Sequence, residues 1–346
     1  MRRPNLSRLT LVAVALAALA ALAFLARSFS VGRVPLRFEK TVTAMGTFVT
    51  VCVYAPGEDP AAAAVDAALA EVARLEHLLS HFDPDSDVSK INRAPYGAAV
   101  AVSQDTIECL TLAYDVSRRT AGAFDVTVGP LVMLWKNAGK SGVLPTPDEI
   151  AAVREKVSYE SLLIDPDART VTLRRDGVTL DLSAVAKGFI MDKAAAVLRA
   201  RGISAGFVNG GGDMAFIGQN PGGAKWRVGV ADPFNPSAVV SKLFVPECGV
   251  VTSGNYQQFS RIQGKHYSHI IDPRTGWALD GDSAPASVTV VARDAGAADA
   301  WATALSVLGR DGLKPAQDAG VDFLMYFAND GKLVSFESPG MAQYMK

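Results

Sequence analysis

The chain has 346 residues, of which 49% are hydrophobic and 20% are charged, and its formal net charge is −1. This is the composition of a folded globular protein and argues against an intrinsically disordered chain. The balanced charge also argues against the basic surface by which proteins bind nucleic acid, so we expect no nucleic-acid partner.

The N-terminus carries an uncharged apolar run, residues 9–26, preceded by Arg2, Arg3 and Arg8. The run is at the short end of a membrane span and is long for the apolar part of a signal peptide. The arginines predict a cytoplasmic N-terminus with the remaining chain across the membrane. We therefore expect residues 1–30 to be a signal anchor or a cleaved signal peptide, with the anchor favoured, and residues 31–39 to be a linker. The protein is then held at the inner membrane facing the periplasm, or is periplasmic if the leader is cut.

Residues 40–346 contain no obvious internal linker and are expected to form one domain. Alternating residues rich in Val and Thr predict a strand over 41–54, and apolar residues at helical spacing predict a helix over 60–80. Ser103 is suited to cap a helix that runs to about residue 119. Thr146 begins a capping box with proline at the first helical position.

The middle of the chain is expected to hold strands near 161–165, 170–175 and 178–182, the last two joined by a hairpin at Asp176–Gly177. A helix is predicted from Ser183 to about Arg201, followed by a glycine-rich, strand-like region over 205–292.

The C-terminal part begins with the alanine-rich stretch 294–305, which predicts a helix capped by Asp294. A short helix near 312–319 and a hairpin turning at 329–331 follow. Because strands and helices alternate irregularly, the sequence favours an α+β fold with mixed or antiparallel sheets over a regular parallel sheet.

The spacing of the cysteines and histidines gives little evidence for a metal site or a disulfide framework. Cys52, Cys109 and Cys248 are scattered and odd in number, which argues against a full disulfide framework. The apolar, strand-like contexts of Cys52 and Cys248 favour buried thiols there. His77 and His81 are four residues apart, but the intervening residues lack the glutamate of a zinc-protease motif, so we expect a helix-surface pair and no zinc site.

Residues 208–213, V-N-G-G-G-D, place Gly210, Gly211 and Gly212 directly after a predicted strand. Consecutive glycines permit positive φ, and their amides can hold phosphate oxygens. A tight hairpin explains the same residues, and on this stretch alone it is the stronger explanation.

Residues 181–188, D-L-S-A-V-A-K-G, run from a strand end into a predicted helix. Lys187 then lies near the positive end of the helix dipole, where an anionic partner would explain it. A solvated surface lysine is the alternative.

Asp299 and Thr303 lie four residues apart and share one face of the alanine-rich helix. A carboxylate and a hydroxyl oxygen suit a hard cation such as Mg²⁺. The alternative is a threonine bonded to its own helix beside a solvated aspartate.

Residues 266–276, H-Y-S-H-I-I-D-P-R-T-G, end in a predicted turn. His269 and Asp272, near a strand end, are candidates for a general base, although a lone histidine is more often structural.

Seven stretches occur in an order that resembles the ApbE family of FAD:protein FMN transferases over roughly residues 40–340. They are T-A-M-G-T at 43–47, A-G-A-F-D-V-T at 121–127, D-L-S-A-V-A-K-G at 181–188, N-G-G-G-D at 209–213, T-S-G-N-Y at 252–256, H-I-I-D-P-R-T-G at 269–276 and A-D-A-W-A-T-A-L at 298–305. Any one of these stretches is a weak signal, and seven in order are specific.

The resemblance implies a two-lobed α+β domain, related to the T-fold, with FAD between the lobes. It implies Mg²⁺-dependent transfer of the FMN part of FAD to a threonine hydroxyl of an acceptor flavoprotein, a component of an electron-transfer complex, with release of AMP. By resemblance, Asp299, Thr303 and the main-chain oxygen of Ala184 hold the metal, and His269 is the base. The residues that would line the FAD site are Met45, Phe82, Ala123, Phe124, Asp125, Asp181, Lys187 and Ile271, joined by the amides of Gly210, Gly211 and Gly212.

Two other functions stay open at this point. One is an Mg²⁺-dependent FAD pyrophosphatase that gives free FMN and AMP. The other is a non-catalytic FAD-binding accessory protein, which would need neither the metal residues nor His269.

Overall fold

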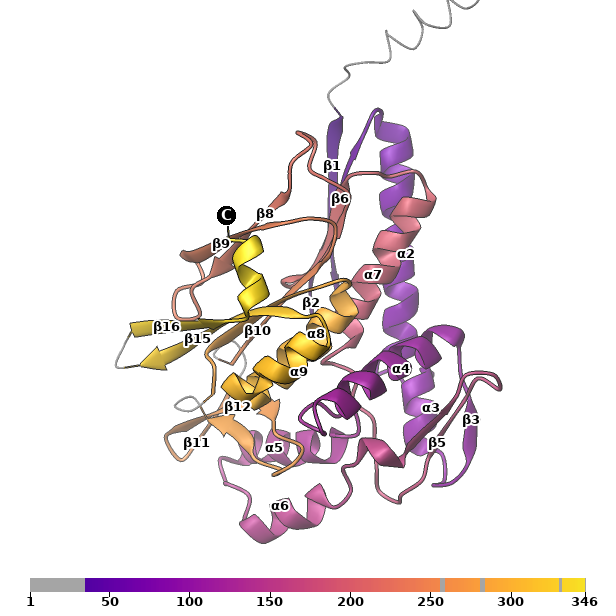
Figure 1. Cartoon of the computed structure of the whole chain (residues 1–346). Coiled ribbons are helices and arrows are strands. Elements are labelled where there is room, and N and C mark those ends of the chain that lie inside the picture. The colour runs from indigo at the N-terminus through magenta and orange to yellow at the C-terminus, as the bar shows by residue number, and fades with distance from the viewer. Residues whose placement is uncertain (1–34, 256–258, 281–283, 330–331, 346) are drawn as a thin grey trace, which may run out of the picture.

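The computed structural model describes residues 35–255, 259–280, 284–329 and 332–345, and its elements are labelled in Figure 1. The helices are α2 (Glu58–Leu79), α3 (Asp87–Arg93), α4 (Gln104–Arg119), α5 (Gly129–Ser141), α6 (Pro147–Arg154), α7 (Ala186–Ala200), α8 (Ala295–Leu308) and α9 (Leu313–Asp318). The strands are β1 (Leu36–Ala44), β2 (Thr47–Ala55), β3 (Ala99–Ala101), β4 (Leu162–Asp165), β5 (Thr170–Leu173), β6 (Gly206–Gly210), β7 (Asp213–Ile217), β8 (Trp226–Ala231), β9 (Val239–Val245), β10 (Gly249–Gly254), β11 (Phe259–Ile262), β12 (Lys265–Ile271), β13 (Ala278–Asp280), β14 (Ser287–Ala292), β15 (Asp322–Asn329) and β16 (Lys332–Glu337).

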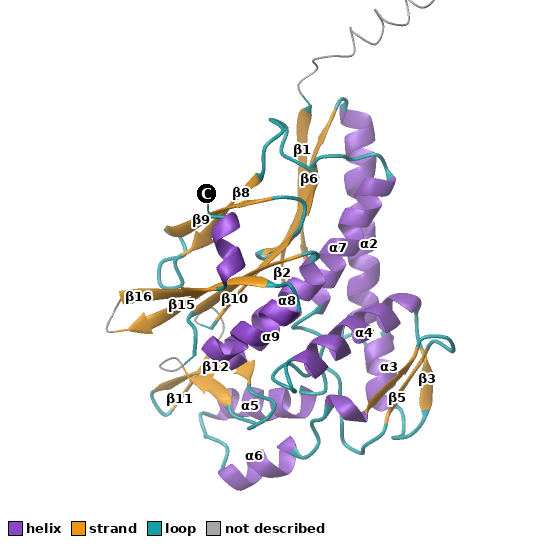
Figure 2. Ribbon diagram, in the orientation of Figure 1, coloured by secondary structure: helices purple, strands orange, loops and turns teal. Residues whose placement is uncertain are grey.

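The described strands form one large sheet and three small ones. The large sheet has the order β1-β2-β6-β7-β10-β14-β15-β16, and its neighbouring strands are antiparallel. The small sheets are β11-β12-β13, β3-β5-β4 and the ribbon β8-β9. Figure 2 shows these sheets combined with long helices, so the predicted α+β class is confirmed.

Helices α2, α7 and α8 lie side by side and cover one face of the large sheet (Figure 1). The main core fills the space between them, and it is built from fully buried residues such as Val51 on β2, Leu75 on α2, Met191 on α7 and Leu305 on α8. Burying these apolar side chains is the main force that fixes the three helices on the sheet.

The opposite face of the sheet is covered by the β8-β9 ribbon and by the C-terminal 3-10 turn Pro339–Gln343. A second cluster fills this layer, with Trp226, Leu243 and Met341 buried in it.

A smaller lobe contains α5, α6 and the β11-β12-β13 sheet, and it lies at the lower end of the molecule in Figure 1. Its own core includes Leu131, Ile150 and Ile271. The indole Nε1 of Trp135 on α5 donates to the carbonyl oxygen of Gly276 at 2.9 Å, which joins the helix to the turn after β12. This turn and His269 on β12 are therefore placed by the small lobe.

Several elements predicted from the sequence are confirmed with their caps. Ser103 accepts the Thr106 N–H at the start of α4, and Thr146 forms the predicted capping box at α6. Asp294 accepts the Ala297 N–H at the start of α8. The helices predicted near 60–80 and 312–319 correspond to α2 and α9, and all three cysteines are buried and free.

Several predictions about local structure were wrong. The strand predicted over 41–54 is two strands, β1 and β2, joined at Met45 and Gly46, which have φ of 52° and 69°. The first strand begins at Leu36, inside the expected linker. Residues 178–182 form no strand, because β5 pairs with β3 and β4 and only Thr179 makes a bridge, to Val128.

A further error concerns α7, which begins at Ala186 and not at Ser183. Ser183 does not cap it, because Val185 is the N-cap residue, and the Ser183 backbone N–H donates to Oδ1 of Asp181 at 2.9 Å in a turn before the helix. Lys187 is consequently the second residue of α7.

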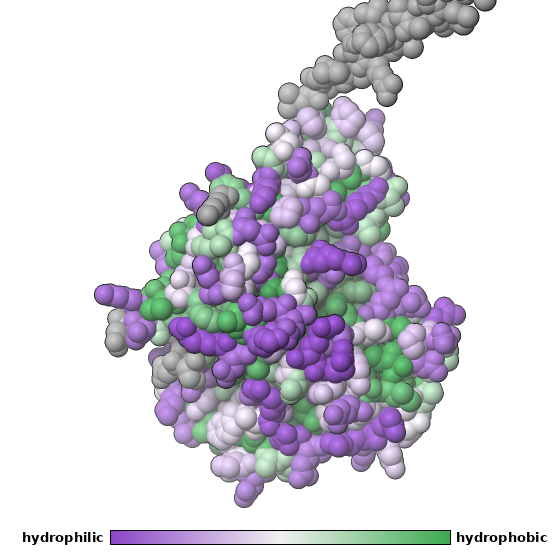
Figure 3. Space-filling view, viewed as in Figure 1, coloured by the Kyte–Doolittle hydropathy of each residue, from purple (hydrophilic) through white to green (hydrophobic). Residues whose placement is uncertain are grey.

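Figure 3 shows a band of strongly hydrophilic residues across the middle of one face, with apolar residues in smaller groups. Among the described helices, none is long and apolar enough to cross a membrane. The predicted membrane or signal segment lies in residues 1–34, and the predicted turn at 330–331 lies beyond Asn329, so both fall outside the described residues, although β15 and β16 pair as a hairpin requires.

Candidate active site

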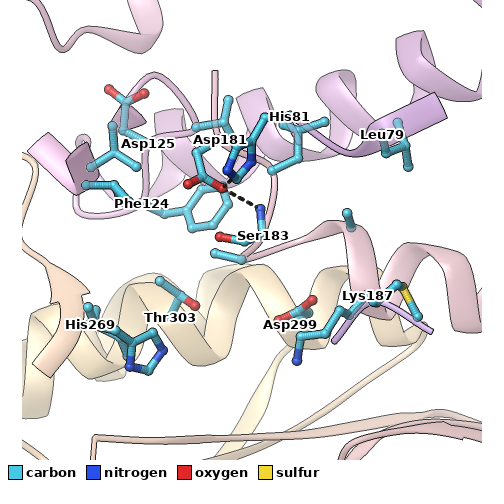
Figure 4. Close-up of a pocket in the computed structure, with 18 of the residues that line it drawn as sticks. Leu79, His81, Phe124, Asp125, Asp181, Ser183, Lys187, His269, Asp299 and Thr303 are labelled. Atoms are coloured by element: carbon cyan, nitrogen blue, oxygen red, sulfur yellow. Dashed lines mark hydrogen bonds and ion pairs between the residues drawn. The ribbon is translucent and has the colours of Figure 1, made fainter. Parts of the chain in front are cut away.

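A cavity of about 590 Å³ opens between the helical layer and the small lobe. Figure 4 shows Asp299 and Thr303 on one face of α8, with Lys187 beside Asp299 and His269 near Thr303. His81, Asp181 and Ser183 lie on the opposite wall. The residues lining the cavity come from α2 and the loop after it, residues 123–132, the segment 181–190, β10, β12 with the turn after it, and α8.

Most of the predicted site residues meet in this cavity although they are far apart in the chain. These residues are Met45, Phe82, Ala123, Phe124, Asp125, Asp181, Ala184, Lys187, His269, Ile271, Asp299 and Thr303.

The three glycines are the exception, because Gly210, Gly211 and Gly212 are not among the residues that line the cavity. Gly211 and Gly212 have φ of 67° and 108° and form the two-residue turn between β6 and β7. Their amides have partners, since the Gly211 N–H donates to the carbonyl oxygen of Phe48 and the Gly212 N–H to Oδ1 of Asn209. The hairpin explanation of this stretch was therefore right, and the prediction of phosphate-holding amides finds no support.

The hairpin nevertheless contributes to the site through the residue after it. Asp213 is 2% exposed, and its Oδ2 accepts a hydrogen bond from Nζ of Lys187 at 2.7 Å. Burial lowers the pKa of Lys187, but the carboxylates of Asp213 and Asp299 outweigh this and leave that pKa raised. Lys187 is therefore a held cation at the cavity wall, and the prediction of a free surface lysine does not apply.

Asp299 is 3% exposed and belongs to the wall of the cavity. Its Oδ2 accepts the backbone N–H of Gly188 at 3.0 Å. Burial, followed by the charge of Asp213, raises the pKa of the Asp299 carboxyl to about 7. The prediction of a solvated aspartate on a surface helix is excluded by this burial.

Two further carboxylates fix the surrounding elements. Asp192 on α7 accepts the N–H groups of Ala295 and Gly296 at 2.9 and 2.7 Å, so α7 caps the helix that carries Asp299. Burial raises the pKa of the Asp192 carboxyl to about 7. On another wall, burial raises the pKa of Asp125 to about 6 despite hydrogen bonds from Thr127 and Tyr159.

His269 projects from β12, a strand of the small lobe, and is exposed to solvent at the cavity. Asp272, the other candidate for a base, is not among the lining residues and instead forms an ion pair with Arg274 at 2.9 Å. The geometry therefore favours His269 over Asp272 for proton transfer.

Sequence reasoning missed three polar residues of the site. Glu76 on α2 lines the cavity, and its Oε1 accepts the Met45 N–H at 2.7 Å, which holds the β1–β2 turn. His81 lies beyond the end of α2 and lines the cavity, so it does not form a helix-surface pair with His77. Asp213 is the last residue of the glycine-rich stretch 208–213, and its place in that stretch was the one sequence signal that pointed to it.

The oxygen donors at α8 fit Mg²⁺ better than a softer metal. Among the described residues, no group of three or more His, Cys, Asp or Glu side chains could hold an ion. Asp299, Thr303 and Ala184 all line the cavity and offer a carboxylate, a hydroxyl and a main-chain oxygen. These are donors of the kind that Mg²⁺ uses, with few protein ligands and the rest from water or phosphate. Burial and the charge of Asp213 raise the pKa of the Asp299 carboxyl, and a cation bound beside it would favour the ionised form.

The fold and the cavity define an α+β protein with an acid–base and oxygen-donor site between a helix-covered sheet and a smaller lobe. Comparison with known sequences extends this assignment, because the model of the ApbE family matches residues 45–325, which is most of the chain. The chain belongs to the ApbE family and is an enzyme of the transferase class.

Individual relatives agree with this assignment. The chain is 34% identical to an FAD:protein FMN transferase of Klebsiella pneumoniae over 77% of each chain. It is 32% identical to an FAD:protein FMN transferase of Vibrio cholerae, over 77% of this chain and 80% of the relative. An ApbE protein of Thermotoga maritima has a similar solved structure, with a TM-score of 0.80 and 30% identity over 90% of this chain and all of the other.

Proposed function

We propose that this protein is an FAD:protein FMN transferase, which uses Mg²⁺ to transfer the FMN part of FAD to a threonine hydroxyl of an acceptor flavoprotein and releases AMP. The observation that carries the proposal is the meeting of Asp299, Thr303, Lys187 and His269 in one cavity. The names of the relatives, 32–34% identical over most of the chain, support it.

The cavity residues divide the work of such a reaction between two regions. Asp299, Thr303 and the main-chain oxygen of Ala184 would hold the Mg²⁺. When bound, this ion supplies positive charge to the phosphate oxygens at which negative charge develops. Lys187, fixed by Asp213, adds a second positive charge in the same region.

His269 would act at the other side of the cavity. A threonine hydroxyl is a weak nucleophile, so a base must take its proton as the bond from its oxygen to the FMN phosphorus forms. The bond from that phosphorus to the AMP oxygen breaks in the same reaction, and AMP leaves with the electron pair. His269 is exposed, which lets an acceptor protein bring its threonine to the imidazole.

The acceptor is proposed to be a subunit of an electron-transfer complex. We further propose that residues 1–30 hold the enzyme at the inner membrane with its domain in the periplasm, or direct it there and are removed. The apolar run over 9–26 and the arginines before it support this localisation.

One observation keeps a second activity in view. Because His269 is exposed, water can reach the position expected for the threonine oxygen. The same site would then act as an FAD pyrophosphatase that releases FMN and AMP.

Incubation with FAD, Mg²⁺ and a threonine-containing acceptor, followed by mass spectrometry, tests the proposal. An acceptor mass increased by one FMN less one water, together with free AMP, is the expected result. Free FMN and AMP with an unlabelled acceptor would identify the pyrophosphatase instead, and unchanged FAD would overturn both.

A further inference from the structure

His81 occupies a position in the cavity that the proposed reaction does not use. Helix α2 ends at Leu79, and Ser80 is extended with φ −80° and ψ 123°, so the chain leaves the helix before His81. His77, one turn earlier, stays on the helix, and its Nδ1 pairs with Oδ2 of Asp83. The two histidines, four residues apart, therefore face different surroundings: His77 lies on the surface and His81 lines the cavity.

The backbone and ring of His81 are both held in place. Its carbonyl oxygen accepts the hydroxyl of Ser89 on α3 at 3.2 Å. The ring centroid lies 3.9 Å from that of Phe82, with 40° between the ring planes. The side chain is 28% exposed, so one part of the imidazole is covered and another part is open to the cavity.

The covered side of the ring faces a carboxylate. Nδ1 of His81 lies 3.7 Å from Oδ1 of Asp181, which is within ion-pair distance but longer than a hydrogen bond. Asp181 is buried, and the Ser183 N–H fixes the same oxygen at 2.9 Å (Figure 4). A protonated imidazole has two N–H donors, so the one not facing Asp181 stays available to a ligand.

The charges of the cavity lining bear on how an anionic nucleotide could bind beside His81. The carboxylates that line the cavity are Glu76 on α2, Asp125, Asp181 and Asp299. Lys187 already pairs with Asp213, and Nζ of Lys136 on α5 lies outside the lining, 5.0 Å from the Phe82 ring centroid. The cavity lining thus carries four carboxylates and one lysine, so one further positive charge would favour the binding of an anionic dinucleotide.

We propose that His81, protonated and held against Asp181, is a substrate-binding residue that donates a hydrogen bond to an acceptor oxygen of the flavin nucleotide. The inference rests on the proposed function, because it takes the flavin nucleotide as the ligand of this cavity. His81 and His269 then act in opposite protonation states. His81 binds as the imidazolium, whereas His269 must be neutral to accept a proton.

The test compares FAD affinity, followed by flavin fluorescence without added metal, for the wild type, His81→Asn, His81→Arg and the control His77→Asn. At pH 5.5 His81→Asn should bind FAD roughly tenfold more weakly than the wild type, and at pH 8.5 the two should differ by less than about twofold. His81→Arg should bind FAD tightly at both pH values, and His77→Asn should match the wild type. The other titratable groups that line the cavity are the same in every variant, so the ratio between variants isolates His81.

Equal affinities of the wild type and His81→Asn at pH 5.5, or a ratio that does not change with pH, would overturn the inference while leaving the transferase intact. A wild type that binds no FAD would instead overturn the proposed function itself. Under turnover, the loss in His81→Asn should appear in KM with little change in kcat, because the residue binds substrate and moves no proton. Riboflavin, which has the flavin ring but no phosphate, shows which oxygen of the nucleotide accepts the hydrogen bond. If the wild type and His81→Asn differ in riboflavin affinity as they do in FAD affinity, the oxygen belongs to the flavin ring. If they bind riboflavin equally, the oxygen belongs to the phosphates.

Discussion

The backbone N–H of Gly188 on α7 donates to Oδ2 of Asp299 on α8 at 3.0 Å, so one helix fixes the carboxylate that the other carries. The helices approach this closely because Gly188 has no side chain. A Cβ at this position would lie 2.1 Å from the carbonyl oxygen of Ala295 and 2.8 Å from Cβ of Asp299.

Gly188→Ala should therefore separate α7 from α8. We expect a loss of about 1–3 kcal/mol in the free energy of unfolding, measured in urea, because overpacking forces backbone shifts. FMN transfer should fall with it, because Asp299 moves. Gly57→Ala is the matched control, since Gly57 has an ordinary φ of −154° and the nearest atoms to an added Cβ lie 3.7 Å away. Equal stability and activity in the two variants would contradict the close approach described here.

Asp299→Ala should remove the response to Mg²⁺. The wild type should be stabilised by about 2.7 kcal/mol when Mg²⁺ is at a hundred times its dissociation constant, and the variant should not respond, as followed by thermal unfolding with and without the ion. FMN transfer should be lost, whereas FAD should still bind to the variant, with a lower affinity than to the wild type. Ser306→Ala, on the same helix but bonded to the Ala302 carbonyl, serves as the control. Full activity of the wild type in EDTA would rule out the metal assignment.

His269→Asn should lower the rate of FMN transfer by about 10²–10⁴-fold with little change in FAD affinity, because general bases contribute rate factors of that size. His266→Asn provides the comparison, since His266 lies on the same strand, is exposed and stacks on Phe259. Single-turnover kinetics would separate the chemical step from binding. A variant that transfers FMN at the wild-type rate would remove His269 from the mechanism.

Lys187 and Asp213 should behave as a coupled pair. Single substitutions Lys187→Met and Asp213→Asn should each raise the KM for FAD, because Lys187 either disappears or loses its anchor. The double variant should cost less than the sum of the two, with a coupling of about 0.5–3 kcal/mol in a double-mutant cycle. Strict additivity would mean that Asp213 does not position Lys187.

Asp192 should give the enzyme a pH-dependent stability. Its pKa is raised by burial to about 7 in the folded protein, so it contributes stability at low pH that is lost as the pH rises from about 4 through about 7. In Asp192→Asn this fall should be smaller over the same interval, as measured by urea unfolding from pH 4.5 to 8. Asp167→Asn, at an exposed position in the turn between β4 and β5, should retain the wild-type slope. Parallel slopes for all three proteins would show that Asp192 does not titrate in this range.

The sequence predicted the elements whose signals are local. Helix caps at Ser103, Thr146 and Asp294 rest on hydrogen bonds between residues three apart, and all three are present. The strand over 41–54 was misread because its turn depends on Met45, a residue with no turn preference that Glu76 on α2 holds at positive φ. A distant contact thus overrode the local pattern.

The sequence by itself determined the α+β class, the capped helices and the pairing of Asp299 with Thr303 on one helical face. Only the tertiary structure decided that His81 lines the cavity, that Asp213 holds Lys187, and that the glycine turn between β6 and β7 lies outside the cavity lining. The reason is separation along the chain: the Gly188–Asp299 contact joins residues 111 positions apart and the Asp192–Ala295 contact joins residues 103 apart. Hydrogen bonds over such distances depend on how the helices pack on the sheet, which no local pattern of residues records.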